Sequence, residues 1–172
     1  GKKVGVTAPG SSTNMMVSFF LAQHGLKPTD VSFIGVGAGA GAVTALRSGQ
    51  IDAIANLDPV ISTLVKEDAL HLIADTRTLQ DAQKIFGGNM PSGCLYTAQA
   101  FIDANPNTTQ ALANAMVRAD KWIRASSVDD IAKLVPQSYL LGDPDLYKLA
   151  LKGNREGLSP DGLVPEDGPQ TA

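Results

Sequence analysis

The chain has 172 residues, enough for one domain with a substantial hydrophobic core. Hydrophobic residues make up 44% of it and charged residues 18%, which excludes an intrinsically disordered chain. The net charge is −3 and aromatic residues are only 5%, so the sequence lacks the basic excess and the stacking side chains that nucleic-acid binding uses.

Strand-like and helical segments alternate along residues 1–90. We predict strands at Lys3–Thr7, Val31–Val36, Ile51–Ala55 and Leu70–Ala74. The predicted helices are Ser11–His24, Ala40–Ser48 and Pro59–Lys66, the last of them with Asp58 as its N-cap and proline in its first turn. This alternation is typical of βαβ units, so we expect an α/β fold with a mainly parallel sheet flanked by helices.

The pattern changes after Gly87 and Gly88. One more strand is predicted at Gly93–Thr97, and the chain beyond it is expected to be helical. The longest predicted helix, 107–125, has an apolar stripe that must be buried somewhere: Leu112, Ala115, Met116, Ala119, Trp122 and Ile123. Two shorter helices are predicted to start at Ser127 and at Asp143, and residues 157–172 are a tail rich in glycine and proline.

Ligands of parallel α/β sheets bind beyond the carboxyl ends of the strands. The loop after the first predicted strand contains Gly10, Ser11, Ser12 and Thr13, directly at the start of a helix. Free N–H groups and the helix dipole favour an anion there, and three hydroxyls exceed what one helix cap needs. An N-cap alone would explain one serine, so both interpretations stay open.

The loop after the second strand repeats glycine at positions 35, 37, 39 and 41. A dinucleotide-binding fingerprint would need glycine where Ala40 stands, and it would need an acidic residue about 20 positions on, near Asp52 or Asp58. The glycine repeat has two other interpretations. It could be a flexible entry into the following helix, or Gly37 could form a second wall of the ligand site. After the third strand, Asn56 has no capping role and is the stronger ligand candidate, whereas Asp58 suits a cap.

The remaining reactive side chains suggest no catalysis and no metal site. His24 ends a predicted helix, His71 opens a strand, and neither has metal-ligand spacing to a carboxylate or cysteine. Cys94 is the only cysteine, so it cannot form an internal disulfide, and we expect it to be small and buried. Met15 and Met16 are expected in the core. No apolar run has the length of a membrane span, and no signal peptide is visible.

In order and spacing, several short motifs resemble the substrate-binding proteins of ABC importers, of the nitrate, sulfonate and taurine type also called NMT1-like. They are Gly1–Val6 with Gly10-Ser-Ser, Ala45–Ala53, Asp58-Pro-Val, Asp75–Thr78, Phe86–Gly88, Phe101–Pro106 and Ser159–Gly162. The resemblance implies a periplasmic-binding-protein type II fold of two lobes. Residues 1–90 would be the second lobe, 91–97 a crossover strand, 98–156 a helical segment of an incomplete first lobe, and 157–172 a tail. The chain would then be a fragment of about half the protein.

The resemblance also implies a function. The chain would capture a small, anionic solute outside the cytoplasm, without cofactor or catalysis, and deliver it to a membrane permease. Gly10, Ser11, Ser12 and Thr13 would hold the acidic head group, with Gly37, Asn56 and Asp58 beside it. A nucleotide-dependent enzyme using the 35–41 turn and a ligand-sensing regulatory domain are the alternatives. Because the partner of the apolar stripe is missing, we also expect self-association of the fragment.

Overall fold

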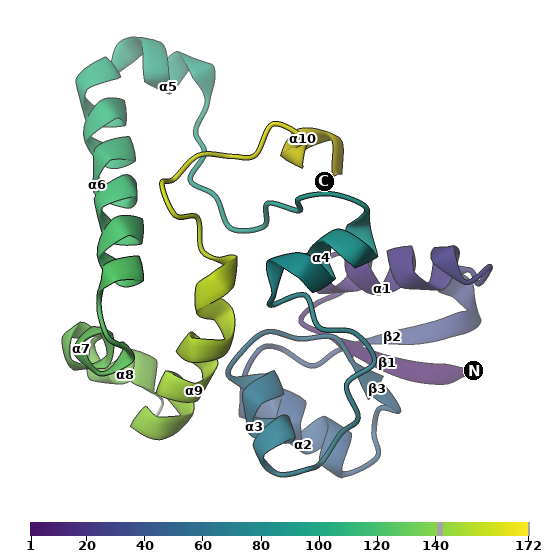
Figure 1. The fold of residues 1–172 in the computed structure, drawn as a ribbon. Helices are drawn as coiled ribbons and strands as arrows, with labels where there is room; N and C mark the ends of the chain where they lie inside the picture. Colours follow the sequence, from purple (N-terminus) through teal and green to yellow (C-terminus); the bar gives the residue numbers. More distant parts are fainter. Residues whose placement is uncertain (141–142, 172) are drawn as a thin grey trace. The chain divides into compact units, whose positions relative to one another are not determined.

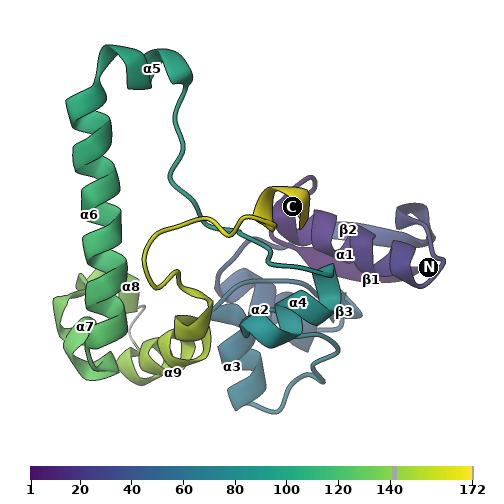
Figure 2. The ribbon, with the colours of Figure 1, turned by 45° about the horizontal axis from the view of Figure 1, so that its top comes forward.

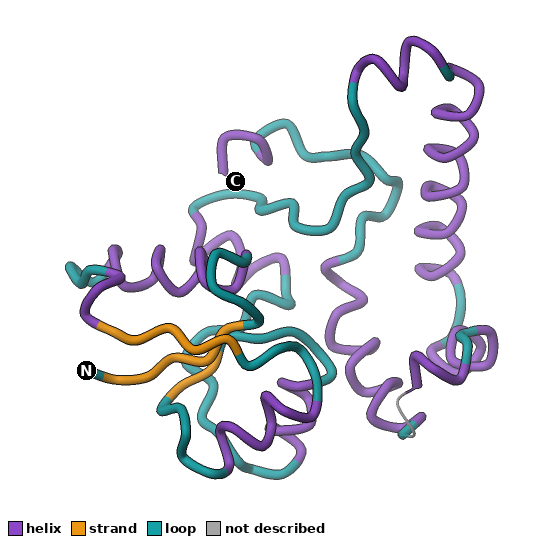
Figure 3. Tube along the Cα trace, turned by 180° about the vertical axis from the view of Figure 1, so that it is seen from behind, coloured by secondary structure: helices purple, strands orange, loops and turns teal. Residues whose placement is uncertain are grey.

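The computed structural model describes residues 1–140 and 143–171. The chain forms two compact units, Gly1–His71 and Leu72–Ala172. In the part of the chain that the structure describes, all strands belong to the first unit and the second unit is helical (Figure 3). The α/β pattern followed by helices is therefore confirmed, whereas the assignment of residues 1–90 to one lobe stays a prediction.

The first unit is built on a three-stranded parallel sheet in the order β2-β1-β3. Lys2 of β1 lies opposite Val31 of β2, and Val4 lies opposite Ala53 of β3. Figures 1 and 3 show α1 on one face of the sheet and α2 with α3 on the other. The elements are β1 (Lys2–Val6), α1 (Ser12–Gln23), the 3₁₀ helix η1 (Pro28–Asp30), β2 (Val31–Gly35), α2 (Ala40–Arg47), β3 (Ala53–Ile54) and α3 (Val60–Lys66).

The core of this unit lies between the sheet and the pair α2–α3. Ala42 and Val43 of α2 pack with Val60 and Leu64 of α3, and Leu64 is completely buried. Gly5 lets the central strand approach this core, because a Cβ there would lie 2.5 Å from Ile51 Cδ1. A close-packed core of this kind tolerates little change in side-chain volume. The core therefore holds the sheet in place, and the sheet carries the loops described below.

The second unit is arranged around the long helix α6. Figure 2 shows α5 at one end of α6 and α7 with α8 at the other. Near that second end, Arg155 donates to the carbonyl oxygens of Arg124 and Ser126, which satisfies acceptors at the C-terminus of α6. The elements are α4 (Leu79–Phe86), α5 (Gln99–Ala104), α6 (Pro106–Ala125), α7 (Val128–Leu134), α8 (Gln137–Leu140), α9 (Pro144–Asn154), the 3₁₀ helix η2 (Arg155–Gly157) and α10 (Gly168–Thr171).

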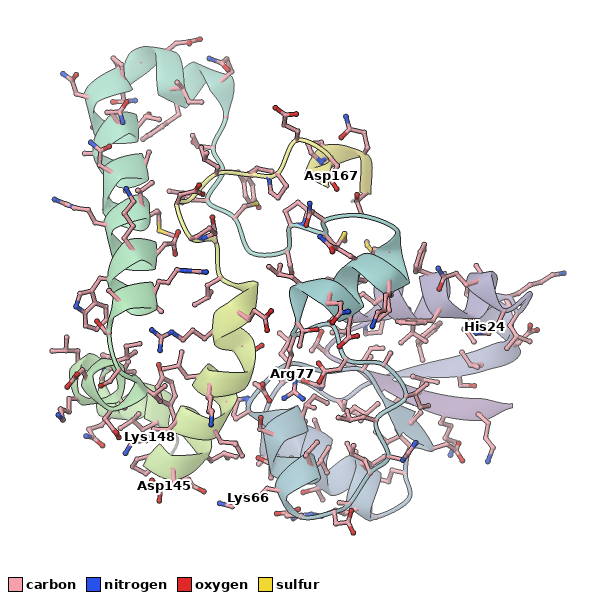
Figure 4. The ribbon with its side chains drawn as sticks, in the orientation of Figure 1. His24, Lys66, Arg77, Asp145, Lys148 and Asp167 are labelled. Carbon is pink, nitrogen blue, oxygen red and sulfur yellow. The ribbon has the colours of Figure 1, made fainter. Side chains whose placement is uncertain are left out.

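Side-chain pairs tie the smaller helices of the second unit together. Lys148 of α9 pairs with Asp129 of α7 at 2.7 Å, and the hydrogen bond to the Asp129 carboxylate raises the pKa of Lys148. The carboxylate of Asp167 accepts from the backbone N–H and the side-chain amide of Asn89, which anchors the C-terminal segment beside the end of α4. Figure 4 labels Lys148 on α9 and Asp167 by α10. No helix among residues 1–140 and 143–171 is both long enough and apolar enough to span a bilayer.

Several local predictions are wrong. Residues 70–74 and 93–97 form no strand, since neither segment has the ladder hydrogen bonds to another described strand that a strand needs. Cys94 is exposed within the second of these segments instead of buried. Met15 is exposed as well, since α1 is apolar around most of its circumference and the sheet covers only one side of it.

The apolar stripe of α6 is also exposed within the single chain. Leu112, Met116 and Trp122 are each more than one-third exposed, and no residue of α6 is buried. The stripe was expected to be buried, and contacts within the single chain do not bury it. Self-association through this stripe stays a prediction.

The pair Asp75–Arg77 gives a testable pH dependence. Arg77 Nε and Nη2 donate to the Asp75 carboxylate at 2.7–3.1 Å, and these bonds hold the pKa of Asp75 below its usual value. A carboxyl whose folded pKa is lowered stabilises the fold above its unfolded pKa of about 3.9, and this contribution is lost as the pH falls through the folded value. We expect Asp75→Asn to lower the free energy of unfolding by about 1 kcal/mol at pH 7, with the difference from wild type narrowing below about pH 4.

Urea denaturation at pH 7 and at pH 3 measures this difference. Asp145→Asn is the matched control, because Asp145 is 89% exposed and its nearest cation, Lys148, is 3.9 Å away. That control should change stability by less than about 0.5 kcal/mol. An Asp75→Asn deficit of equal size at both pH values would contradict the role given to the ion pair.

Candidate functional site

Three loops meet at the carboxyl edge of the sheet, because β1, β2 and β3 are parallel. Hydrogen bonds connect them in sequence. The backbone N–H of Gly37, after β2, donates to the carbonyl of Thr7, after β1, at 3.1 Å. The side-chain amide of Asn56, after β3, donates to the carbonyl of Gly37 at 2.8 Å. The structure therefore brings the loops of Gly10–Thr13, Gly37 and Asn56 together, as the topology predicts.

The first loop is organised by a buried hydroxyl. Thr13 is only 2% exposed, and its Oγ1 accepts from the backbone N–H of Thr7 at 3.0 Å. The same oxygen lies 3.0 Å from Thr7 Oγ1 and 2.8 Å from Ser11 Oγ. Thr13 was predicted to face the ligand, but its hydroxyl is already saturated by three partners within the loop. This residue therefore shapes the loop through its hydroxyl, and a direct contact of Thr13 with the ligand stays a prediction.

The start of α1 leaves donors open. Ser11 is the N-cap, with its Oγ accepting from the backbone N–H of Asn14, which confirms the capping interpretation for this serine. Ser12 is exposed and has no hydrogen bond to another described side chain or backbone group through its hydroxyl. Within the described residues, the backbone N–H groups of Ser12 and Thr13 likewise have no acceptor. These donors at a positive helix end suit an anion.

Two glycines with positive φ shape the edges of the site. Gly10 has φ +78° and Gly37 has φ +71°, a backbone conformation that side-chain-bearing residues rarely adopt. No atom lies within 4 Å of a Cβ built on either residue, so the conformation and not the space selects glycine there. Gly10 is held by its N–H, which donates to Asn14 Oδ1 at 2.8 Å.

The two acidic residues considered for a ribose are used elsewhere. Asp52 lies by the amino end of β1, where it pairs with Lys2 and accepts from the backbone N–H of Lys3, and this N–H bond is the main cause of its lowered pKa. It is therefore at the opposite edge from the glycine turn. Asp58 accepts from the backbone N–H of Ser62 at 2.8 Å and so caps α3, although Pro59 and not Asp58 takes the N-cap position.

His24 lies away from this edge. His24 Nδ1 donates to the carbonyl of Phe20 at the C-terminal end of α1, where Figure 4 labels it. Within the described ranges, no three His, Cys, Asp or Glu side chains are grouped so that they could hold a metal ion.

Comparison with known proteins gives a family. A model of the NMT1-like family matches residues 1–135. The chain belongs to the NMT1-like family. No match was found among curated proteins.

Two solved structures resemble this NMT1-like chain. A protein from Bordetella bronchiseptica RB50 is 70% identical with a TM-score of 0.93, and the match covers 99% of this chain and 54% of that one. The alkanesulfonate-binding protein SsuA from Xanthomonas axonopodis pv. citri, bound to MOPS, is 22% identical with a TM-score of 0.64, covering 99% and 53%. This likeness confirms the predicted binding-protein fold, and the NMT1-like chain spans about half the length of both structures.

The candidate site of the NMT1-like chain offers uncharged hydrogen-bond donors. Residues 7–14 and 36–41 contain no charged side chain. Hydroxyls, open N–H groups and a helix start can bind an oxyanion by directed hydrogen bonds, but they provide no nucleophile paired with a base. Thr7, which bonds to Thr13 and Gly37 in this site, was given no role from the sequence, although its position at the end of the first strand places it at this edge.

Proposed function

We propose that this chain is part of the solute-binding component of an ABC importer and that it holds the head group of a small oxyanion. The observation that carries the proposal is the start of α1, where the hydroxyl of Ser12 and the backbone N–H groups of Ser12 and Thr13 have no acceptor among the described residues. Family membership and the likeness to a sulfonate-binding protein support the same solute class. The protein would act outside the cytoplasm, bind without catalysis and pass its solute to a membrane permease.

In this proposal each residue has a separate role. The hydroxyl of Ser12 and the N–H groups that open α1 contact the anion, and Ser11 holds the helix start in shape. Gly37 and Asn56 form the adjoining wall, because the Asn56 amide fixes the carbonyl of Gly37. Asp58 supports α3 as a cap, and its negative charge would not favour an anion in direct contact.

The test is calorimetric titration of the complete protein with MOPS, taurine and nitrate. We expect the double variant Ser11→Ala and Ser12→Ala to weaken binding of the best of these anions by about 10- to 100-fold, because hydrogen bonds to a charged group contribute about 1.5–3 kcal/mol each. Ser48→Ala is the matched control. Ser48 is an exposed residue at the end of α2, and its loss should leave the affinity unchanged.

The outcomes separate the functions considered. Unchanged affinity in the double variant would contradict the anion site at α1. Titration with nicotinamide and flavin nucleotides addresses the alternative use of the glycine turn, and micromolar binding of either one would overturn the proposed solute class.

A further inference from the structure

The hydrogen bonds around Thr13 allow only two proton arrangements. A threonine hydroxyl has one hydrogen and two acceptor positions. The backbone N–H of Thr7 takes one acceptor position of Thr13 Oγ1. The two neighbouring hydroxyls, Thr7 Oγ1 at 3.0 Å and Ser11 Oγ at 2.8 Å, share the remaining acceptor position and the hydrogen. One of these neighbours must therefore donate to Thr13, and the other must accept from it.

The surroundings of Ser11 decide between the two arrangements. Ser11 Oγ accepts from the backbone N–H groups of Ala8 and Asn14, both at 3.4 Å, which uses its two acceptor positions. A third donor could not be accommodated, so Ser11 donates its own hydrogen to Thr13. Thr13 then donates to Thr7. The chain runs in one direction, from Ser11 through the buried Thr13 to Thr7.

At the end of this chain, the hydrogen of the Thr7 hydroxyl has no acceptor among the described residues. Thr7 is half-buried, it follows the central strand, and its carbonyl is bound by Gly37 of the neighbouring loop. We propose that Thr7 is a further solute-contacting residue of the site, whose hydroxyl is oriented to donate to an oxygen of the bound solute. This inference rests on the proposed function.

The one-directional chain has a consequence for specificity. Each hydroxyl that accepts a hydrogen bond becomes a stronger donor, so the terminal Thr7 O–H is polarised by the two hydroxyls behind it. The solute atom at this position must accept. A sulfonate or carboxylate oxygen satisfies that requirement, whereas an ammonium group placed there would face a donor. Thr7 therefore discriminates by the hydrogen-bond role of the head group and not only by its charge.

The test compares Thr7→Val with Thr7→Ser in the complete protein, titrated with MOPS and taurine. Valine keeps the shape and removes the hydroxyl, and we expect about tenfold weaker binding of whichever sulfonate the wild type binds. Serine keeps the hydroxyl and should restore affinity to within about threefold of wild type. Thr44→Val is the matched control, because Thr44 is exposed on α2 and its hydroxyl bonds, among the described residues, only to the Ala40 carbonyl.

Melting temperatures of the same variants separate binding from folding. The proposal is overturned if wild type binds a sulfonate and Thr7→Val binds it equally well, or if Thr7→Ser fails to restore affinity while melting like wild type. A wild-type protein that binds none of MOPS, taurine and nitrate overturns the proposed solute class, and the role of Thr7 with it. A wrong role for Thr7 and a wrong function therefore give different titration results.

Discussion

Replacing Leu64 by alanine should lower the free energy of unfolding by about 3 kcal/mol. Leu64 is 0% exposed and packs in α3 against Ala42, Val43 and Val60. Truncation removes the transfer free energy of the buried methyl groups, and it leaves a cavity that the helices α2 and α3 cannot fully close. Urea denaturation followed by circular dichroism measures the effect.

Leu26→Ala provides the control, because it makes the same chemical change at a side chain that is 48% exposed. We expect that variant to lose less than about 1 kcal/mol. Similar losses at both positions would mean that the packing of α3 against α2 does not carry the stability of the first unit.

Local signals were sufficient for most of the first unit. Helices α1 and α2 were expected within one residue of their observed ends, since a serine cap opens the first and Gly25 and Gly49 follow the two. The parallel order of the strands followed from their alternation with helices. Only β3 is much shorter than expected, two residues instead of five, because it pairs with β1 alone and over two positions.

Strand pairing could not be read from residues 70–74 and 93–97. Both segments have apolar, β-prone residues, but a strand exists only where a neighbouring backbone completes its hydrogen bonds. Neither segment pairs with β1, β2 or β3, the strands of the described residues. Helix α4 was not predicted for a different reason: its start is marked by a single cap, Thr78, whose hydroxyl accepts from the backbone N–H of Asp81.

The site was predictable in place but not in detail. Parallel topology is enough to bring Gly37 and Asn56 to the edge that carries Gly10 and Ser11. Composition does not show which hydroxyl forms its hydrogen bonds within the loop. This depends on the distances between residues 7, 11 and 13, and the turn at Gly10 sets those distances. The resemblance therefore suggested Thr13 as a ligand contact without showing that its hydroxyl is used within the loop, and the donor that we propose in its place, the Thr7 hydroxyl, has no signal of its own in the composition.

Thr13→Val should destabilise the protein by about 3 kcal/mol and weaken anion binding together. Valine fills the same volume but removes the acceptor of the Thr7 N–H and breaks the contacts to both neighbouring hydroxyls. A buried donor left without a partner costs about 1–3 kcal/mol, and two further hydrogen bonds are lost with it. Denaturation and titration with MOPS measure the two effects, and Thr13→Ser, which keeps the oxygen, should retain most of both properties.

A double-mutant cycle with Thr7→Val tests whether the three hydroxyls act as one chain. In wild type, removing the Thr7 hydroxyl deletes a donor that Thr13 orients; in the Thr13→Val background that orientation is already lost. We therefore expect the second substitution to weaken anion binding much less than the first, with a coupling of about 1 kcal/mol between them. Additive losses would mean that Thr7 and Thr13 contribute separately, and the directional chain would then be wrong even if both residues matter for binding.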